Sequence, residues 1–303
     1  MTPPDDHPAP RPPSALDRWA DRARLGRTGH LSTPMAFLMR WLVTPWARLW
    51  FRPHLDGWEH LPDGPFLLVS NHSGGAGGEL FCLAALWYAR FGRAERPITG
   101  LALPSAFFFP VVAWALRGFG AIPATYHHAH GALRDGVPVL VFPGGAHEAI
   151  RPVWRARQVD FGGRQGYLRI AADAHVPIVP MAIWGSHFAS PILWRSRVLP
   201  WLLIAPRVFG LKTWPLSVLG LAGCAAILAS TLWIPWWAAL VLAGAWLASP
   251  FPLLPWLPWR VRVRIGTPIL PDDTPAHLDA TAARVQTAVQ DLLNTLANEH
   301  TMP

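Results

Sequence analysis

The sequence has little charge, almost no lysine and only two cysteines. Of its 303 residues, 15% are charged, and Lys212 is the only lysine. Cys82 and Cys224 stand far apart in apolar surroundings, match no metal-ligand or redox spacing, and are interpreted as packing residues. Prolines and acids occupy residues 3–10, where a secretory signal needs a basic and then an apolar region. We therefore expect no signal peptide and a disordered tail over residues 1–33.

What the chain does contain is apolar and aromatic. Half of the residues are hydrophobic, and 18 tryptophans stand against 3 tyrosines. Because tryptophan prefers the membrane interface, a membrane surface explains this composition. The net charge of +8 comes almost entirely from arginines that are dispersed or flank apolar runs. No nucleic-acid motif is visible, so we expect no nucleic-acid partner, and anionic lipid or a phosphorylated substrate instead.

The longest uncharged stretch runs from residue 213 to residue 259. As a helix it would reach roughly 70 Å, about twice the ~30 Å hydrocarbon core of a bilayer, so it can cross, turn at Pro235 and return. Basic residues flank it on both sides, which predicts a membrane hairpin inserted from the cytoplasmic face. Four prolines after residue 249 shorten the second arm. Two transmembrane helices and a re-entrant hairpin therefore both remain open.

A second apolar segment, residues 34–52, mixes aromatic side chains with Arg40 and Arg48 and carries Pro45 near its middle. These features make a poor spanning helix but suit an amphipathic segment that lies in the headgroup layer. The alternative is a helix that covers the domain's own core.

Between the two apolar segments, short apolar runs bounded by glycine or proline alternate with helical patterns. The expected strands are 66–70, 98–103, 119–123, 137–142 and 176–183, and the expected helices are 79–91, 105–117, 126–135 and 164–175. This alternation predicts an α/β fold with a mostly parallel sheet flanked by helices, and with the apolar hairpin inserted. The α/β domain would occupy residues 53–212, and a strand and helix in 260–303 would complete it.

The strongest chemical motif is Asn71-His72-Ser73-Gly74-Gly75, which directly follows an expected strand. A glycine-rich turn at residues 142–145 follows another. Both are expected at the carboxyl edge of one sheet, where α/β proteins place their ligands. A lone histidine is often a buried one satisfied by the backbone, but this one opens a glycine run that suits neither helix nor central strand. The pairing indicates base-catalysed chemistry on a hydroxyl.

With these pieces in order, the chain resembles the PlsC-like glycerolipid acyltransferases, the family of the lysophospholipid acyltransferases. Four blocks carry the resemblance over roughly residues 55–186: Ser70-Asn71-His72, Gly118-Phe119-Gly120-Ala121-Ile122-Pro123, Val141-Phe142-Pro143-Gly144-Gly145 and Val176-Pro177-Ile178-Val179-Pro180. Four ordered blocks are far more specific than any single one. The resemblance implies transfer of a fatty acyl group from a thioester to a hydroxyl, with His72 as the general base.

Two departures from the family's pattern stand out. The family usually has an aspartate five positions after the histidine, where this chain has Gly77, and the nearest acid is Glu79. The third block usually continues Glu-Gly-Thr-Arg, whereas here two glycines are followed by Ala146, His147 and Glu148. This form resembles the diacylglycerol acyltransferase branch. The acid that orients the imidazole is thus Glu79 or Glu148, although Glu79 also suits a helix N-terminus.

The remaining site residues are candidates for binding substrate. The glycines of the third block suit an oxyanion or a phosphate, or simply a tight turn, and arginines suit the anionic acyl donor. The candidates are Asn71, Gly74, Gly75, Arg117, Phe142, Pro143, Gly144, Gly145, Arg151 and Arg155. We expect no metal, because His127, His128 and His130 match no common zinc spacing. No cofactor is expected beyond acyl-CoA or acyl carrier protein as co-substrate.

The sequence thus predicts an enzyme of lipid metabolism at the cell membrane, with its active site facing the cytoplasm. The first expected acceptor is 1-acylglycerol-3-phosphate or another lysophospholipid. Diacylglycerol or a long-chain alcohol is the alternative, as is a degenerate member that binds lipid without catalysis. A hydrolase is disfavoured, because no Gly-x-Ser-x-Gly elbow is present.

Overall fold

A computed structural model describes residues 15–72, 74, 77–93, 95–208, 210–271 and 278–299. It contains a seven-stranded sheet in the order β1-β9-β6-β2-β5-β3-β4. The bounds are β1 (His54–Asp56), β2 (Leu67–Ser70), β3 (Thr99–Ala102), β4 (Ile122–Pro123), β5 (Val139–Val141), β6 (Ile178–Trp184) and β9 (Arg262–Ile265). All neighbouring strands run parallel except β9 against β6. The prediction of a mostly parallel α/β fold is confirmed.

The two central strands are apolar along their length because both faces of the sheet are covered. Every residue of β2 and β6 is buried. Successive side chains of a strand point to opposite faces. Leu67 and Val69 accordingly belong to one hydrophobic core, and Leu68 belongs to the other. A continuous apolar strand of this kind is typical of a parallel sheet between helical layers.

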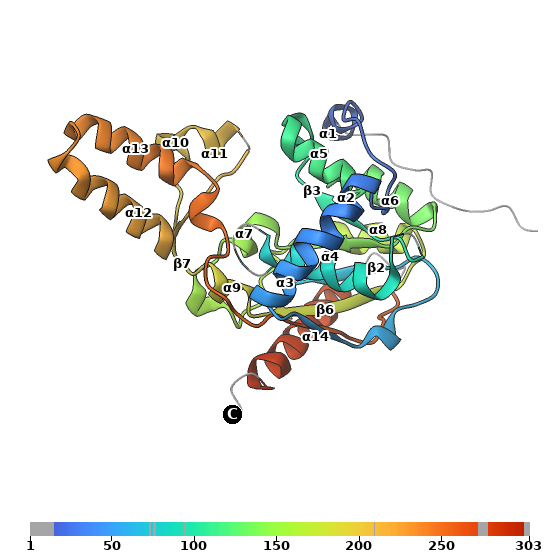
Figure 1. The fold of residues 1–303 in the computed structure, drawn as a ribbon. Helices are drawn as coiled ribbons and strands as arrows, with labels where there is room; N and C mark the ends of the chain where they lie inside the picture. The colour runs from blue at the N-terminus through green and yellow to red at the C-terminus, as the bar shows by residue number, and fades with distance from the viewer. Residues whose placement is uncertain are drawn as a thin grey trace, which may run out of the picture.

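Helices form one layer on each face of the sheet (Figure 1). On one face lie α6 (Tyr126–Arg134), α8 (Gly166–Asp173) and α14 (Leu278–Glu299). On the other lie α2 (Thr33–Leu38), η1 (Met39–Val43), α3 (Thr44–Trp50) and α4 (Gly78–Phe91). The helix α14 packs along β6, so the residues after the hairpin return to the main sheet as β9 and α14.

The segment 34–52 is apolar on two sides. Met35, Met39 and Val43 are buried in the core beside α4, which is the alternative that the sequence left open. Trp41 and Leu49 are exposed on the outer side. One side of the segment therefore covers the core, and its exposed apolar side is the part that remains for a membrane interface.

Part of the segment expected to be a tail has regular contacts. Residues 15–20 form α1 (Ala15–Ala20), and the chain then runs along the end of α5 (Pro110–Gly118). The Gly29 amide donates to the Gly120 carbonyl at 2.9 Å, and the Ser32 amide donates to the Gly118 carbonyl at 2.8 Å. The same contact explains why the expected strand 119–123 shortens to β4, because Gly120 turns at φ +66° against the backbone of residues 27–30.

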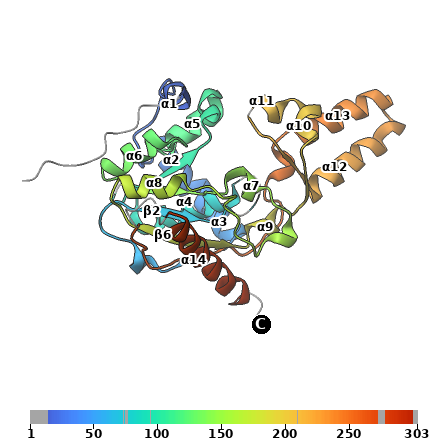
Figure 2. The ribbon, with the colours of Figure 1, turned by 180° about the vertical axis from the view of Figure 1, so that it is seen from behind.

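The uncharged stretch forms a helical hairpin of α12 (Val218–Ala229), η5 (Ser230–Leu232) and α13 (Trp236–Ala248), which starts directly after Pro235. It projects away from the sheet beside α10 (Leu199–Leu203) and α11 (Ala205–Val208), as both views show (Figures 1 and 2). Its arms have 12 and 13 residues. Among the described residues no helix is long and apolar enough to span a bilayer, so the expected transmembrane helix is not found.

The hairpin is held at its base by an antiparallel ribbon that the sequence did not predict, β7 (Ile192–Ser196) with β8 (Trp214–Ser217). Ser217 caps α12 by accepting from the Gly220 amide and donates to the Pro252 carbonyl. Between the arms, the Trp246 indole donates to the Gly220 carbonyl at 3.1 Å. A side chain at Gly223 would collide with that indole, so this glycine lets the two helices approach closely.

Substitutions at two glycines test how closely the backbone packs at the end of β6. Gly185 (φ +108°) follows β6, and a side chain there would collide with the Arg260 carbonyl, whereas Gly136 (φ +79°) has open space around it. We expect Gly136→Ala to lower the unfolding free energy by about 1–2 kcal/mol through backbone strain alone, and Gly185→Ala to lower it further. Denaturant unfolding of both variants measures this. An equal loss would show that the segment before β9, which carries Arg260, shifts freely.

Candidate active site

The loop after β2 brings His72 against an acid from the next helix. His72 Nδ1 and Glu79 Oε1 lie 2.5 Å apart, within ion-pair distance, although their angles do not meet hydrogen-bond criteria. Glu79 stands in the first turn of α4, which begins after Gly77 in a left-handed conformation (φ +81°). The start of α4 thus brings a glutamate to the imidazole ring, two positions after the place where the family usually has an aspartate.

The two partners differ in their access to solvent. The Glu79 side chain is fully buried, while the His72 side chain is 18% exposed. Phe142 stacks on the imidazole, with ring centroids 4.5 Å apart and an interplanar angle of 29°. The buried acid faces Nδ1 and the phenyl ring covers one face. The Nε2 side of the ring is then the side on which a reacting group can approach.

The Glu148 carboxylate also contacts the loop that carries His72. Its Oε2 accepts from the His72 backbone amide at 2.8 Å, and its Oε1 accepts from Arg151 at 2.7 Å and from the Asp160 amide at 3.1 Å. Burial raises the pKa of Glu148, and the Arg151 charge opposes that shift. Glu79 therefore contacts the imidazole, and Glu148 fixes the backbone that carries it.

The third block forms a tight turn after β5 and leads into α7 (Gly145–Ala149). The Gly145 amide donates to the Phe142 carbonyl at 2.9 Å, so this N–H is used within the turn. Arg164 donates to the carbonyls of Pro143 and Gly144, both at 2.9 Å. A side chain at Gly144 would collide with the Glu148 side chain and the Asp160 carbonyl. These contacts require glycine at position 144 because the Glu148 carboxylate passes directly beside it.

Other predicted substrate-binding residues have structural partners. The Asn71 amide is buried and bonds both backbone groups of Ile183 on β6, at 2.9 and 2.8 Å. Arg151 is buried with Glu148. Gly74 (φ +96°) lies against the backbone of residues 186 and 187, and Gly75 falls outside the described residues. Arg155 is exposed, and Arg117 lines a separate cavity that none of the proposed catalytic residues reaches.

His187 is a buried residue that the sequence reasoning missed. It lies in α9 (Ser186–Ala189), directly after β6, and neither ring nitrogen has a hydrogen-bond partner. Burial lowers the pKa of His187 well below its usual value, and the charges of Arg151 and His72 act in the same direction. The available signal was the one that identified His72: a histidine that follows a buried parallel strand.

The base of the hairpin reaches this site. Arg195 on β7 donates to the His147 carbonyl at 2.9 Å. His147, Glu148, Arg155 and Arg195 help to line a small cavity of about 20 Å³ beside α7. The ribbon at the base of the hairpin thus contacts α7, the helix that follows the third block.

Neither cysteine contributes to this chemistry. Burial raises the pKa of the Cys82 thiol, and the nearby Glu79 charge adds to the shift. Cys224 packs inside the hairpin against the Ala243 carbonyl. Within the described ranges, no group of three or more histidine, cysteine, aspartate or glutamate residues is placed to hold a metal ion.

Residues 52–184 match the model of the Acyltransferase family. An uncharacterized protein of Mycobacterium tuberculosis is 29% identical over 237 residues, which cover 78% of this chain and 57% of that protein. The DGAT1/2-independent enzyme synthesizing storage lipids of Gallus gallus is 29% identical over 143 residues, 46% of this chain and 42% of that enzyme. The chain spans little more than half the length of the mycobacterial relative.

The fold also has a solved counterpart. The 1-acyl-sn-glycerophosphate acyltransferase PlsC of Thermotoga maritima superposes with a TM-score of 0.50 and 18% sequence identity, over 87% of this chain and 80% of that one. Residues 52–184 thus carry an Acyltransferase domain, the stretch in which the four blocks lie, and the fold is similar to that of PlsC.

The buried His187 predicts a pH dependence of stability. Because its folded pKa is lowered, the unfolded chain takes up a proton near pH 6.5 that the folded chain does not, so stability falls as the pH drops through that range. We expect His187→Phe to remove up to about 1.4 kcal/mol per pH unit from the slope between pH 7 and 5. Urea unfolding measures the slope, with the exposed His127→Phe as the control variant. Equal slopes in the two variants would contradict this assignment.

Proposed function

We propose that this protein transfers a fatty acyl chain from a thioester donor, acyl-CoA or acyl carrier protein, to a hydroxyl group of a lipid acceptor. The observation that carries the proposal is the contact between His72 Nδ1 and the buried Glu79 carboxylate. A carboxylate at Nδ1 holds the imidazole in the tautomer whose Nε2 accepts a proton. No metal or cofactor is needed for this reaction.

The proposed reaction needs only His72, Glu79 and the two substrates. His72 Nε2 takes the proton of the acceptor hydroxyl as its oxygen attacks the acyl carbonyl carbon. The new carbon–oxygen bond forms, and the tetrahedral intermediate then loses the carbon–sulfur bond. The imidazolium returns its proton to the departing thiolate. Glu79 stabilises the imidazolium between these two events.

A neutral acceptor such as diacylglycerol, or a long-chain alcohol, fits the surroundings of His72 better than a lysophospholipid. Arg151 is buried and paired with Glu148, so this arginine is not available to an acceptor phosphate. The glycine-rich third block and the similarity to enzymes that synthesise storage lipids support the same acceptor class. A lysophospholipid remains the second candidate, because Arg155 is exposed beside the third block.

The hairpin supports a proposed association with a membrane. Trp233, Trp236 and Trp237 are exposed at its turn, and both arms are apolar on all sides. Indole side chains of this kind prefer the bilayer interface. With arms of 12 and 13 residues, we favour a hairpin that dips into the cytoplasmic leaflet over one that crosses. The hairpin would then hold the active site against the membrane that supplies the acceptor.

The activity test examines the proposed pair of His72 and Glu79. In an assay with labelled long-chain acyl-CoA and a panel of diacylglycerol, fatty alcohol and lysophospholipids, we expect Glu79→Gln to lower kcat by about 10²–10⁴-fold, and His72→Ala by at least as much. Neither change should alter the circular dichroism spectrum. The exposed His127→Ala is the control variant and should keep its activity. Full activity in Glu79→Gln would contradict the proposed dyad.

The assay with the panel of acceptors also decides between the candidate acceptors. Acylation of diacylglycerol or alcohol alone would support the neutral acceptor, and acylation of lysophospholipid alone would reverse our order. If no acceptor reacts with acyl-CoA or acyl carrier protein while lipid still binds, the non-catalytic alternative gains support.

The hairpin makes a separate prediction. Trp233 is 87% exposed at the turn between α12 and α13. We expect Trp233→Ser to weaken binding to phosphatidylcholine vesicles about tenfold in flotation assays, because a large apolar side chain leaves the bilayer. Trp154, on the main domain, is 61% exposed and provides the matched control Trp154→Ser. Equal effects of the two substitutions would show that the hairpin is not part of the membrane contact.

A further inference from the structure

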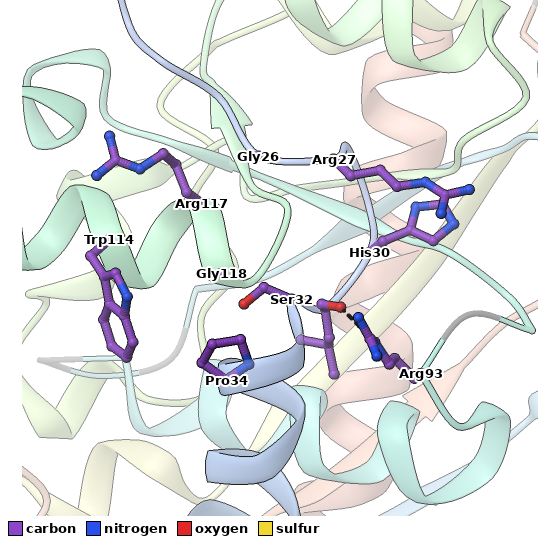
Figure 3. A pocket seen from close by; sticks show the side chains of 10 residues that line it. Gly26, Arg27, His30, Ser32, Pro34, Arg93, Trp114, Arg117 and Gly118 are labelled. Atoms are coloured by element: carbon purple, nitrogen blue, oxygen red, sulfur yellow. Dashed lines mark hydrogen bonds between the residues drawn. The ribbon is translucent and has the colours of Figure 1, made fainter.

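A cavity of about 550 Å³ lies away from His72, between the loop that precedes α2 and the end of α5. Arg27, His30 and Arg93 lie on one side of it and Arg117 and Trp114 on the other (Figure 3). None of its ten lining residues is acidic. Its volume is within the range of small-molecule sites, and its charge is of one sign.

Among the described residues, the arginines that line this cavity form no ion pair with a carboxylate; they are Arg27, Arg93 and Arg117. Arg93 donates to the Leu31 carbonyl at 3.1 Å and to Thr33 Oγ1 at 2.8 Å, which fixes its guanidinium at the edge of the cavity and uses two of its five N–H donors. Arginine forks of this kind match the geometry of phosphate oxygens.

The surface beside the cavity is apolar. Val111 is 80% exposed and Trp114 is 50% exposed on α5. Trp19 on α1 packs against Phe108, the last residue of the short helix η3 (Pro104–Phe108) that precedes α5, with ring centroids 4.4 Å apart, so α1 contacts the segment that leads into α5. Both views place α1 beside α5 (Figures 1 and 2). Soluble proteins seldom expose contiguous apolar patches of this kind unless something binds there.

We propose that this cavity binds the phosphate-bearing headgroup of an anionic phospholipid while the α1 and α5 patch rests in the bilayer interface. The cationic cavity and the apolar patch together point to this ligand. A cationic cavity alone would suit any phosphate, and an apolar patch alone would suit any hydrophobic partner. An anionic phospholipid offers a phosphate and an apolar layer side by side, in the arrangement that the surface presents. The site is distinct from the catalytic histidine and does not depend on acyl transfer.

The test compares vesicles of phosphatidylcholine alone with vesicles that also contain phosphatidylglycerol, by flotation of the full chain without acyl donor. We expect the double variant Arg27→Gln/Arg117→Gln to lose about thirtyfold in affinity for the anionic vesicles, at roughly fivefold per arginine, and little for the neutral ones. The matched control is Arg134→Gln/Arg169→Gln, which removes the same charge from exposed positions on α6 and α8. It should lose less than about threefold.

Three results would overturn the proposal. Equal losses in the two double variants would show general charge attraction, and no loss in either would show that the cavity does not bind lipid. Displacement of anionic vesicles by free coenzyme A at constant ionic strength would assign the cavity to the acyl donor instead. Thermal unfolding of both variants checks that the loop before α2 stays folded. Loss of neutral-vesicle binding in Trp233→Ser, with anionic selectivity retained, keeps this site separate from the hairpin.

Discussion

The buried carboxylate of Glu148 is the contact on which the site depends. It accepts from the side chain of Arg151 and the backbone of Asp160, both nearby in the sequence, and from the backbone of His72, which lies 76 residues earlier. A buried ion pair of this kind stabilises little by itself, because desolvation offsets most of the attraction. The Glu148 carboxylate instead fixes the position of the loop after β2, so that the imidazole contacts Glu79 and Phe142 in one orientation.

This arrangement explains how one family position can change without loss of geometry. The usual aspartate would reach the histidine from within the loop, whereas here the loop continues to Gly77 and the acid comes from the first turn of α4. In the third block, glycine at position 144 leaves room for the Glu148 side chain that returns from α7. The two departures in sequence thus supply one acid for the ring and one for its backbone.

Much of the fold was predictable, because parallel strands and amphipathic helices leave periodic patterns. The central strands and the helices α4, α6, α8 and α14 lie where those patterns placed them. The antiparallel insertion of β9 and the β7–β8 ribbon were not, since pairing partners leave no local signal. For the site, His72 and the two acids were identified from motifs. The burial of Asn71, which bonds Ile183 on β6, depends on a contact between distant segments that no motif encodes, and the burial of His187 was not predicted either.

The position of β9 also bears on how the protein is made. In the sheet, β1 pairs with β9 alone, and β9 separates it from β6. During synthesis the ribosome releases β1 first and β9 only after the whole apolar hairpin has emerged. For most of translation β1 has no strand to pair with and one side of β6 is uncovered. The apolar hairpin therefore emerges from the ribosome before the sheet can close, so the domain is completed only after the hairpin has been made.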